Sequence, residues 1–426
     1  MHKDLIVLGI QLLVLMIIYL AIEGAEQFLL QLNLRHLSRL GGEVPPDFME
    51  HVDAGTLRKM RDYTVAHGRA ETIESLISML ITLLFVFGGL LNWFNNFIAA
   101  QGWSPVLSGV VFYLLLVYAG TFLNIPFSLY NTFVLEKRFG FSRQTPAFWL
   151  QDLLKSLLVS TLLLGTLFYG ILWLVMALPE LWWLAGWFFM FCFSLFVLYL
   201  SPYVIEPLFN KFIPIKDVSL EKHIKETMAR AGLKINRVFS MDASKRSSHS
   251  NAYFTGIGHV KRIVLYDTLL ANHTADEIIA ILAHEAGHWK KKHILKMLVL
   301  SQAGSLLGFY GAYLLTAGNL LPGIFQLDIP SMPAKLLLAV FIGSLVLFPL
   351  RPLISYLSRR HEIEADNFAV KLTQTPVPLA HALMKLGKDN LANLHPHPWY
   401  AAVYYSHPPL VQRVNRLLAE KKAQGE

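Results

Sequence analysis

The 426-residue sequence is short of charged residues, which make up 15% of the chain against 54% hydrophobic residues. A soluble protein of ordinary composition carries about 25% charged residues, so a protein surrounded by water on all sides is excluded. Cysteine is scarce as well, because Cys192 is the single one. One thiol cannot form an intramolecular disulfide or a cysteine-rich metal site. The sequence therefore requires no oxidising compartment.

Long apolar runs are abundant instead. A membrane-spanning helix needs about 18 to 20 apolar residues, and a helix satisfies its own backbone hydrogen bonds in lipid. Seven runs fit, namely 5–22, 76–94, 106–125, 153–178, 181–200, 294–317 and 336–353. The first run is longer than the core of a signal peptide and no clean A-x-A site follows it, so we interpret it as an uncleaved anchor. We predict a mainly α, polytopic membrane protein with seven long transmembrane helices.

Basic residues alternate between the loops. They are concentrated in the loops after the first and third runs, whereas 95–105, 178–181 and 318–333 contain no Lys or Arg. Because basic residues favour the cytoplasmic side, we predict an N-terminus outside and a C-terminus inside. The same preference for Lys and Arg in cytoplasmic loops explains the net charge of +8. We therefore predict no binding to nucleic acid.

The segments outside the membrane suggest one split domain. We predict five helices in 1–200, the first part of a soluble domain in 201–292, two helices in 293–354, and the second part of the domain in 355–426. The two soluble parts together have the usual size of one domain, and both should face the cytoplasm. The first should contain a helix at 219–231 and strands at 237–241, 252–255 and 262–266, with Gly256 and Gly258 in a turn.

The strongest motif in the chain is H-E-x-x-H, formed by His284, Glu285, Ala286, Gly287 and His288. Thr274 and Glu277 form a capping-box pattern, which predicts that the motif lies on a helix. The i, i+4 spacing then lets His284 and His288 hold one zinc ion. Glu285 is placed to take a proton from a water molecule that the metal activates. The three fixed letters arise by chance in roughly one chain in forty of this composition, so a third ligand is needed.

The third ligand should be a carboxylate, because zinc hydrolases commonly use two His and one Glu and leave the fourth position open. Glu362 and Asp366 share one helical face after the seventh run. We interpret Glu362 as the ligand and Asp366 as the partner that orients a ligating imidazole. His361 and His293 are rival ligands, and the alternative for the whole face is a solvated surface whose carboxylates pair with neighbouring arginines. Since both ligand segments adjoin membrane runs, the metal should lie close to the membrane and act on substrates delivered along or within it.

These residues together resemble the type I CaaX prenyl proteases, zinc-dependent membrane endopeptidases that trim prenylated C-terminal CaaX motifs. Besides the seven runs and the two metal segments, the resemblance rests on the stretches 249–254 and 406–410 and on Arg413. It implies one Zn²⁺ per chain on His284, His288 and Glu362, with Glu285 as general base. It also implies a ring of helices around an intramembrane chamber, capped at the cytoplasmic face by a split, gluzincin-like zinc metalloprotease domain.

The resemblance assigns roles to three further residues. It implies that Asn251 binds the substrate backbone and that His407 and Arg413 approach the reaction intermediate. An asparagine near an edge strand can donate to and accept from an extended peptide, although a plain turn residue would look the same. His407 could donate to a developing oxyanion, and its alternative is a residue that merely precedes Pro408.

The expected partners are the lipid bilayer and a peptide or protein substrate, prenylated or not. The C-terminal residues show no evident endoplasmic-reticulum retrieval signal, which favours a bacterial cytoplasmic membrane over the endoplasmic reticulum of a eukaryote. Two other functions fit the sequence: a quality-control metalloprotease for membrane proteins, and a transporter or receptor with a structural zinc. Glu285 distinguishes the last of these, because a structural site does not need a general base.

Overall fold

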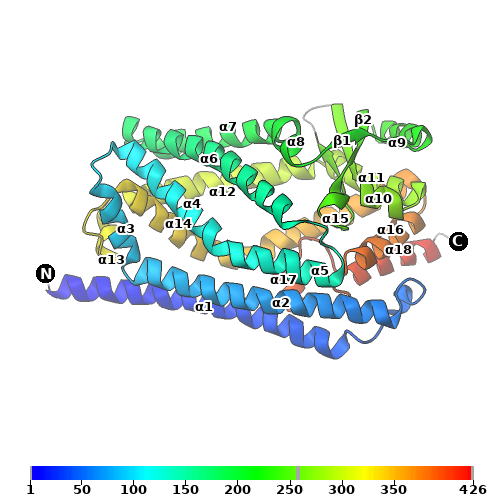
Figure 1. Cartoon of the computed structure of the whole chain (residues 1–426), viewed down its shortest axis with the longest axis horizontal. Helices are drawn as coiled ribbons and strands as arrows, with labels where there is room; N and C mark the ends of the chain where they lie inside the picture. Colours follow the sequence, from blue (N-terminus) through cyan, green and yellow to red (C-terminus); the bar gives the residue numbers. More distant parts are fainter. Residues whose placement is uncertain (1, 256–259, 424–426) are drawn as a thin grey trace.

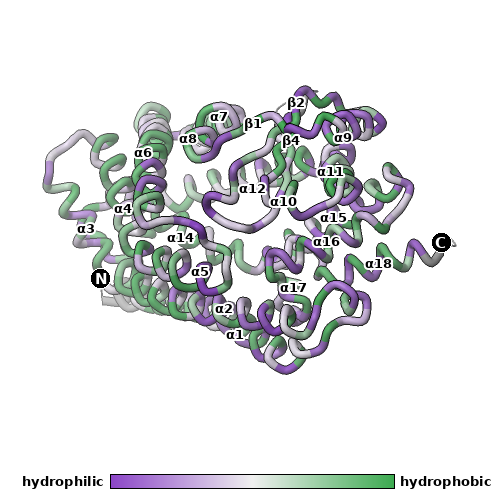
Figure 2. Tube along the Cα trace, turned by 45° about the vertical axis from the view of Figure 1, so that its right-hand side comes forward, coloured by the Kyte–Doolittle hydropathy of each residue, from purple (hydrophilic) through white to green (hydrophobic). Residues whose placement is uncertain are grey.

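The computed structural model describes residues 2–255 and 260–423, so the predicted turn at Gly256 and Gly258 lies outside the described residues. Within them, seven helices are long and apolar enough to cross a membrane, as predicted. Large apolar side chains on these helices are exposed, including Leu158, which is 73% exposed, and Figure 2 shows that hydrophobic residues predominate along the helices. Such exposure is tolerated in lipid and not in water. The seven helices are built on α1 (His2–Leu40), α2 (Ala54–Thr82), α4 (Pro105–Tyr130), α6 (Pro146–Ala177), α7 (Trp182–Leu200), α12 (His293–Thr316) and α14 (Met332–Leu347).

The second helix differs from its prediction at both ends. It begins at Ala54, where Asp53 caps it by accepting hydrogen bonds from two backbone N–H groups, and its apolar span ends at Phe87 rather than at residue 94. Gly89 then adopts a left-handed φ of +85°, which a residue without a Cβ does at little cost, and α3 (Leu90–Ala99) follows. The early start means that the basic residues predicted in a loop lie mostly on helices that continue beyond the apolar run.

The loops predicted to lie outside meet at one end of the molecule (Figure 1). Asn92 and Asn96 in α3 each donate a hydrogen bond of 2.8 Å to Asp328, which follows the short α13 (Leu320–Ile324). Helix α1 starts at this end, and the domain outside the helices lies at the other. The arrangement agrees with the predicted topology, while the assignment of each end to a side of the membrane stays a prediction.

A four-stranded sheet forms one layer of the domain within the described residues, in the order β1-β2-β4-β3. Strand β2 (Lys234–Met241) runs parallel to β4 (Val260–Tyr266), and both remaining pairs are antiparallel. Strand β3 (Ala252–Thr255) is therefore an edge strand. These strands and α9 (Val218–Arg230) confirm the predicted elements. Strand β1 (Phe212–Pro214) was not predicted, because three residues are too few to show a periodic pattern.

The second layer consists of helices from both soluble segments. The central helix α11 (Ala275–Lys290) packs on the sheet and on α15 (Arg351–Thr373), and α10 (Asp267–Asn272), α16 (Val377–Asp389), α17 (Pro398–Tyr404) and α18 (Leu410–Ala423) complete the layer. One apolar core joins α9, β2, β4 and α11. A second core joins α11, α16 and α18 to Phe48, Met60 and Phe139, which come from the membrane half of the chain. The membrane half therefore contributes directly to the domain core.

Candidate active site

Helix α11 holds the H-E-x-x-H motif in a fixed position. The predicted capping box is present, because Thr274 Oγ1 accepts from the N–H of Glu277 and Glu277 Oε2 accepts from the N–H of Thr274. Lys385 of α16 donates a hydrogen bond of 2.8 Å to the same Glu277 carboxylate. The helix start is thus bound both to itself and to a neighbouring helix. Each such contact at a helix N-terminus is worth about 1 kcal/mol.

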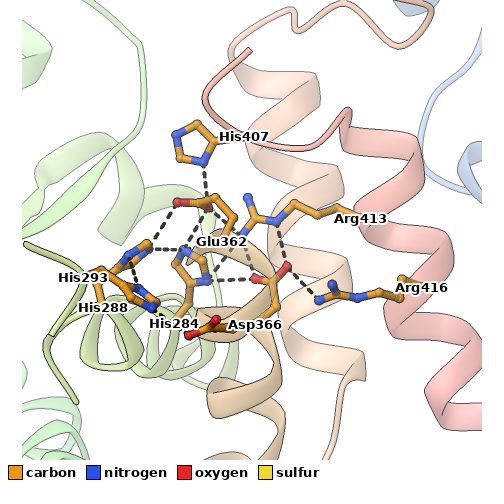
Figure 3. Close-up of polar contacts among 9 residues, drawn as sticks. His284, His288, His293, Glu362, Asp366, His407, Arg413 and Arg416 are labelled. Carbon is orange, nitrogen blue, oxygen red and sulfur yellow. Dashed lines mark hydrogen bonds and ion pairs between the residues drawn. The ribbon is translucent and has the colours of Figure 1, made fainter. Parts of the chain in front are cut away.

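Gly287 brings α11 unusually close to α15. A Cβ atom at this position would lie 2.9 Å from Ala365 Cα and 3.0 Å from Ala365 O, both of them backbone atoms. Glycine is therefore required at the contact. Because Ala365 lies between Glu362 and Asp366, this contact sets the two carboxylates opposite the histidines, as Figure 3 shows.

The three predicted ligands meet at one point. His284 Nε2 lies 3.2 Å from His288 Nε2, and the Glu362 oxygens lie 3.4 Å from His284 Nε2 and 3.2 Å from His288 Nε2. In a tetrahedral zinc site with bonds of about 2.0 to 2.1 Å, neighbouring ligand atoms are separated by roughly 3.3 to 3.4 Å. The observed separations therefore match a zinc site.

The surroundings of these atoms also fit a bound cation. The Nε2 atoms of His284 and His288 lie 3.2 Å apart, and a neutral His284 that donates its one N–H from Nδ1 to Asp366 presents only a lone pair at Nε2. Among the described residues, Glu362 Oε2 is buried and accepts no hydrogen bond, although His407 Nδ1 lies at the ion-pair distance of 2.7 Å. A buried carboxylate oxygen without a hydrogen bond is costly. One metal ion would satisfy all three ligands.

Asp366 supports His284 from behind. It is fully buried and accepts from His284 Nδ1 at 2.8 Å, which leaves Nε2 to face the metal. Arg413 donates to both oxygens of the same carboxylate, at 2.7 Å to Oδ1 and 2.9 Å to Oδ2. Burial alone would lower the pKa of His284, but the hydrogen bonds that its ring donates to Asp366 and Glu362 raise the pKa to about 9 in the absence of metal. The predicted role of Asp366 agrees with this geometry.

Arg413 is buried beside the predicted ligands rather than exposed toward an incoming substrate. Its side chain is buried, and its guanidinium is occupied by Asp366 and lies 3.5 Å from Glu362. Burial alone would lower the pKa of Arg413, but its hydrogen bonds and charge attraction to Asp366 raise the pKa by more than burial lowers it. The guanidinium therefore stays charged. The geometry favours a positioning role, and the predicted contact with substrate stays a prediction. Sequence reasoning missed Arg416, which approaches Asp366 at 3.4 Å from the next turn of α18.

His407 and Glu285 are both accessible to solvent, to different degrees. His407 is in the loop between α17 and α18, and its side chain is 61% exposed while its Nδ1 faces Glu362 (Figure 3). Glu285 is partly exposed, next to His284. The approach of either side chain to a substrate stays a prediction. Asn251 is exposed at the start of the edge strand β3, where its side chain accepts from Ala252 N–H at 2.8 Å.

A second polar cluster holds the segment before Asn251. His249 Nε2 lies 3.3 Å from Glu136 of α5 (Glu136–Phe139), and its Nδ1 lies 3.0 Å from the Asn390 side-chain oxygen. The ring stacks on Phe141 at 4.0 Å, and Asn390 also accepts from Ser250 N–H. Burial lowers the pKa of His249, but the two oxygen acceptors outweigh it, so the pKa is raised. This cluster connects α5, in the membrane half of the chain, to the segment that leads into Asn251 and strand β3.

The rival ligands lie outside the ligand group. His293 and His361 are stacked on each other with ring centres 4.1 Å apart, and the group of possible metal ligands found among the described residues contains neither of them. The solvated-face alternative is wrong, because Glu362 and Asp366 are buried and Arg359 donates to backbone carbonyls at the end of α17. A contact of His293 with the ligand His288 was not foreseen, since the two residues lie on different helices.

Comparisons with known proteins agree with this geometry. A family model described as CAAX prenyl protease N-terminal, five membrane helices, matches residues 33–211, and Peptidase family M48 matches residues 214–421. The chain is 34% identical over 404 residues to CAAX prenyl protease 1 homolog of Arabidopsis thaliana, covering 92% of this chain and 94% of that protein. It is 32% identical over 415 residues to CAAX prenyl protease 1 of Saccharomyces cerevisiae, covering 89% and 90%.

A solved structure shares the fold as well. The crystal structure of S. mikatae Ste24p matches with a TM-score of 0.89 and 31% identity, covering 95% of this chain and 98% of that one. The relatives named here come from a plant and from yeasts. They therefore give no support to the predicted bacterial membrane.

Proposed function

Because the chain belongs to peptidase family M48, as an integral membrane metalloendopeptidase of the CAAX prenyl protease type, we propose that it works with one zinc ion on His284, His288 and Glu362. The observation that carries the proposal is the convergence of three donor residues at separations of 3.2 to 3.4 Å. The chemistry of these donors, two imidazoles and one carboxylate, is that of catalytic zinc sites with an open fourth position.

The chain's own residues supply the proton transfers. When bound, zinc acidifies a water molecule and polarises the substrate carbonyl. The Glu285 carboxylate accepts the proton of the attacking water, the water oxygen bonds to the carbonyl carbon, and Glu285 returns the proton to the amine nitrogen as the C–N bond breaks. Asp366, held by Arg413, keeps the His284 ring oriented throughout. His407, whose Nδ1 lies 2.7 Å from Glu362, would donate a hydrogen bond to the developing oxyanion.

The substrate we propose is a peptide with a prenylated C-terminal CaaX motif. Two relatives carry the name CAAX prenyl protease 1, and the position of the site supports the same chemistry. Helix α12 begins at His293, five residues after His288, and the seventh span continues through α15, which carries Glu362. A lipid-anchored peptide can therefore reach the site from the membrane. Asn251, at the edge strand β3, would hold its backbone.

We further propose that the protease domain is assembled from 201–292 and 355–426 and faces the cytoplasm. The packing of α11 on α15 and α16, which come from the two segments, supports the assembly, and the alternation of basic residues between the loops supports the cytoplasmic orientation. The intramembrane chamber implied by the family resemblance would receive the lipid chain.

The test compares Glu285→Gln with the wild type on a farnesylated CaaX peptide, with products identified by mass spectrometry. The amide keeps the shape of the side chain but accepts no proton, so turnover should fall by at least 100-fold while bound zinc is retained. Asp276→Asn is a matched control, since Asp276 is an exposed acid in the first turn of the same helix. Full turnover by Glu285→Gln would contradict the mechanism.

A further inference from the structure

We propose that His293 and Glu364 form a relay that fixes the orientation of His288 and thereby sets the affinity of the metal site. His293 Nδ1 lies 3.2 Å from His288 Nδ1, and His293 Nε2 lies 3.1 Å from Glu364 Oε2. The His293 ring therefore lies between His288 and Glu364. The inference rests on the proposed function, because it assumes that His288 binds zinc.

The hydrogen positions in this line of three side chains determine one another. A metal on His288 Nε2 takes that lone pair and leaves the proton on Nδ1, which needs an acceptor. The Nδ1 of His293 can accept it only as a neutral imidazole with its own proton on Nε2. That Nε2–H points at Glu364, and an ionised carboxylate can only accept. Every donor in the line therefore meets an acceptor when the metal is bound.

The position of His293 follows from the junction between α11 and α12. Lys292 adopts a left-handed backbone conformation with φ of +57°, which turns the chain and places His293 beside His288. The His293 side chain is 3% exposed, and its ring is stacked on His361 at an angle of 11°. A buried ring packed on one face and hydrogen-bonded at both nitrogens has no freedom to rotate. His293 is thus rigid enough to orient its neighbour.

The two histidine ligands are supported in different ways. His284 donates directly to Asp366, which is fully buried and held by Arg413. His288 is supported through a second imidazole, and the carboxylate at the end of that line, Glu364, is 38% exposed. Water can partly replace an exposed carboxylate, so removing Glu364 should weaken the site less than removing His293.

The experiment measures the zinc dissociation constant of the purified full-length protein in detergent, by competition with a chelator. His293→Phe keeps a ring stacked on His361 but has no nitrogen to accept from His288, and it should bind zinc about 10- to 100-fold more weakly. Glu364→Leu should show a smaller loss, and Glu364→Gln should restore wild-type binding because its amide oxygen accepts. His361→Phe is the matched control, with the same chemical change on the other ring of the stack, and should bind zinc as the wild type does.

A second readout follows the ligand geometry itself. With Co²⁺ in place of zinc, the visible absorption bands of His293→Phe should shift relative to the wild type, while those of His361→Phe should not. Wild-type zinc binding and an unchanged cobalt spectrum in both His293→Phe and Glu364→Leu would overturn the relay. An equal loss in His361→Phe and His293→Phe would overturn it too, since stacking would then be the cause.

Two provisions keep the outcome decisive. If His293→Phe fails to fold, the comparison of Glu364→Leu with Glu364→Gln decides, because Glu364 is partly exposed and its replacement leaves the core intact. His288→Ala separates the relay from the proposed function. Wild-type zinc binding by His288→Ala would refute the zinc site, whereas loss of zinc in His288→Ala with no change in the relay variants would refute the relay alone.

Discussion

A methyl group added at Gly287 should push apart the two helices that carry the metal ligands. In Gly287→Ala the new Cβ would lie 2.9 Å from Ala365 Cα and 3.0 Å from Ala365 O. Both are backbone atoms, so rotation of a side chain cannot relieve the clash. The helices α11 and α15 must separate instead, and Glu362 and Asp366 move with α15.

The size of the effect follows from these distances. Non-bonded carbon atoms are most stable at about 3.5 to 4.0 Å, so the helices would have to separate by roughly 0.6 Å. Metal sites tolerate changes in ligand distance of only about 0.2 Å. Overpacking of this kind costs about 1 to 3 kcal/mol. If the whole of this cost fell on the metal-bound state, zinc binding would weaken by roughly 5- to 150-fold. Any part borne by the fold would lower Tm instead.

Two measurements on the purified protein in detergent separate these effects. Competition with a chelator gives the zinc affinity, and thermal unfolding gives the Tm. Gly304→Ala is the matched control, because nothing lies within 4 Å of a Cβ at Gly304 in α12, and it should bind zinc as the wild type does. If Gly287→Ala kept both the zinc affinity and the Tm of the wild type, the close contact with Ala365 would not be what positions Glu362.

The remaining predictions concern pH, topology and substrate. The contact between His249 and Glu136 raises the pKa of His249, so its stabilisation is full below the unfolded value of about 6.5 and is lost as pH rises through the folded value. The Tm of the wild type should therefore fall more steeply above pH 6.5 than that of His249→Phe, and parallel curves would contradict this. In a protein with Cys192 replaced, a cysteine at exposed Gln101 should be labelled from outside and one at exposed Lys388 only from the cytoplasm, and the reverse pattern would overturn the topology. A farnesylated CaaX peptide should have a higher kcat/KM than its unprenylated form, since each buried methylene contributes about 0.8 kcal/mol. Equal values would favour general quality control of membrane proteins.

Much of the architecture could be read from local patterns. The seven spans were predicted because lipid imposes a minimum length and excludes charge along each helix. The H-E-x-x-H helix was predicted because its cap and its i, i+4 spacing lie within one segment, as does the shared face of Glu362 and Asp366. The errors fell at the ends of elements. The second span ends at Phe87, just before a glycine pair inside an apolar run, and hydropathy alone does not detect such a break.

The sequence by itself therefore determined the membrane class, the number of spans and the residue types of the metal site, since each depends on interactions between near neighbours or with the solvent. Only the tertiary structure decided which distant groups meet. It brought Arg413 into contact with Asp366, His407 into contact with Glu362, and His293 between His288 and Glu364. These contacts depend on the close approach of α11 to α15 and on the turn at Lys292. Packing of this kind joins segments that are far apart in the chain, and it leaves no periodic signal in the sequence.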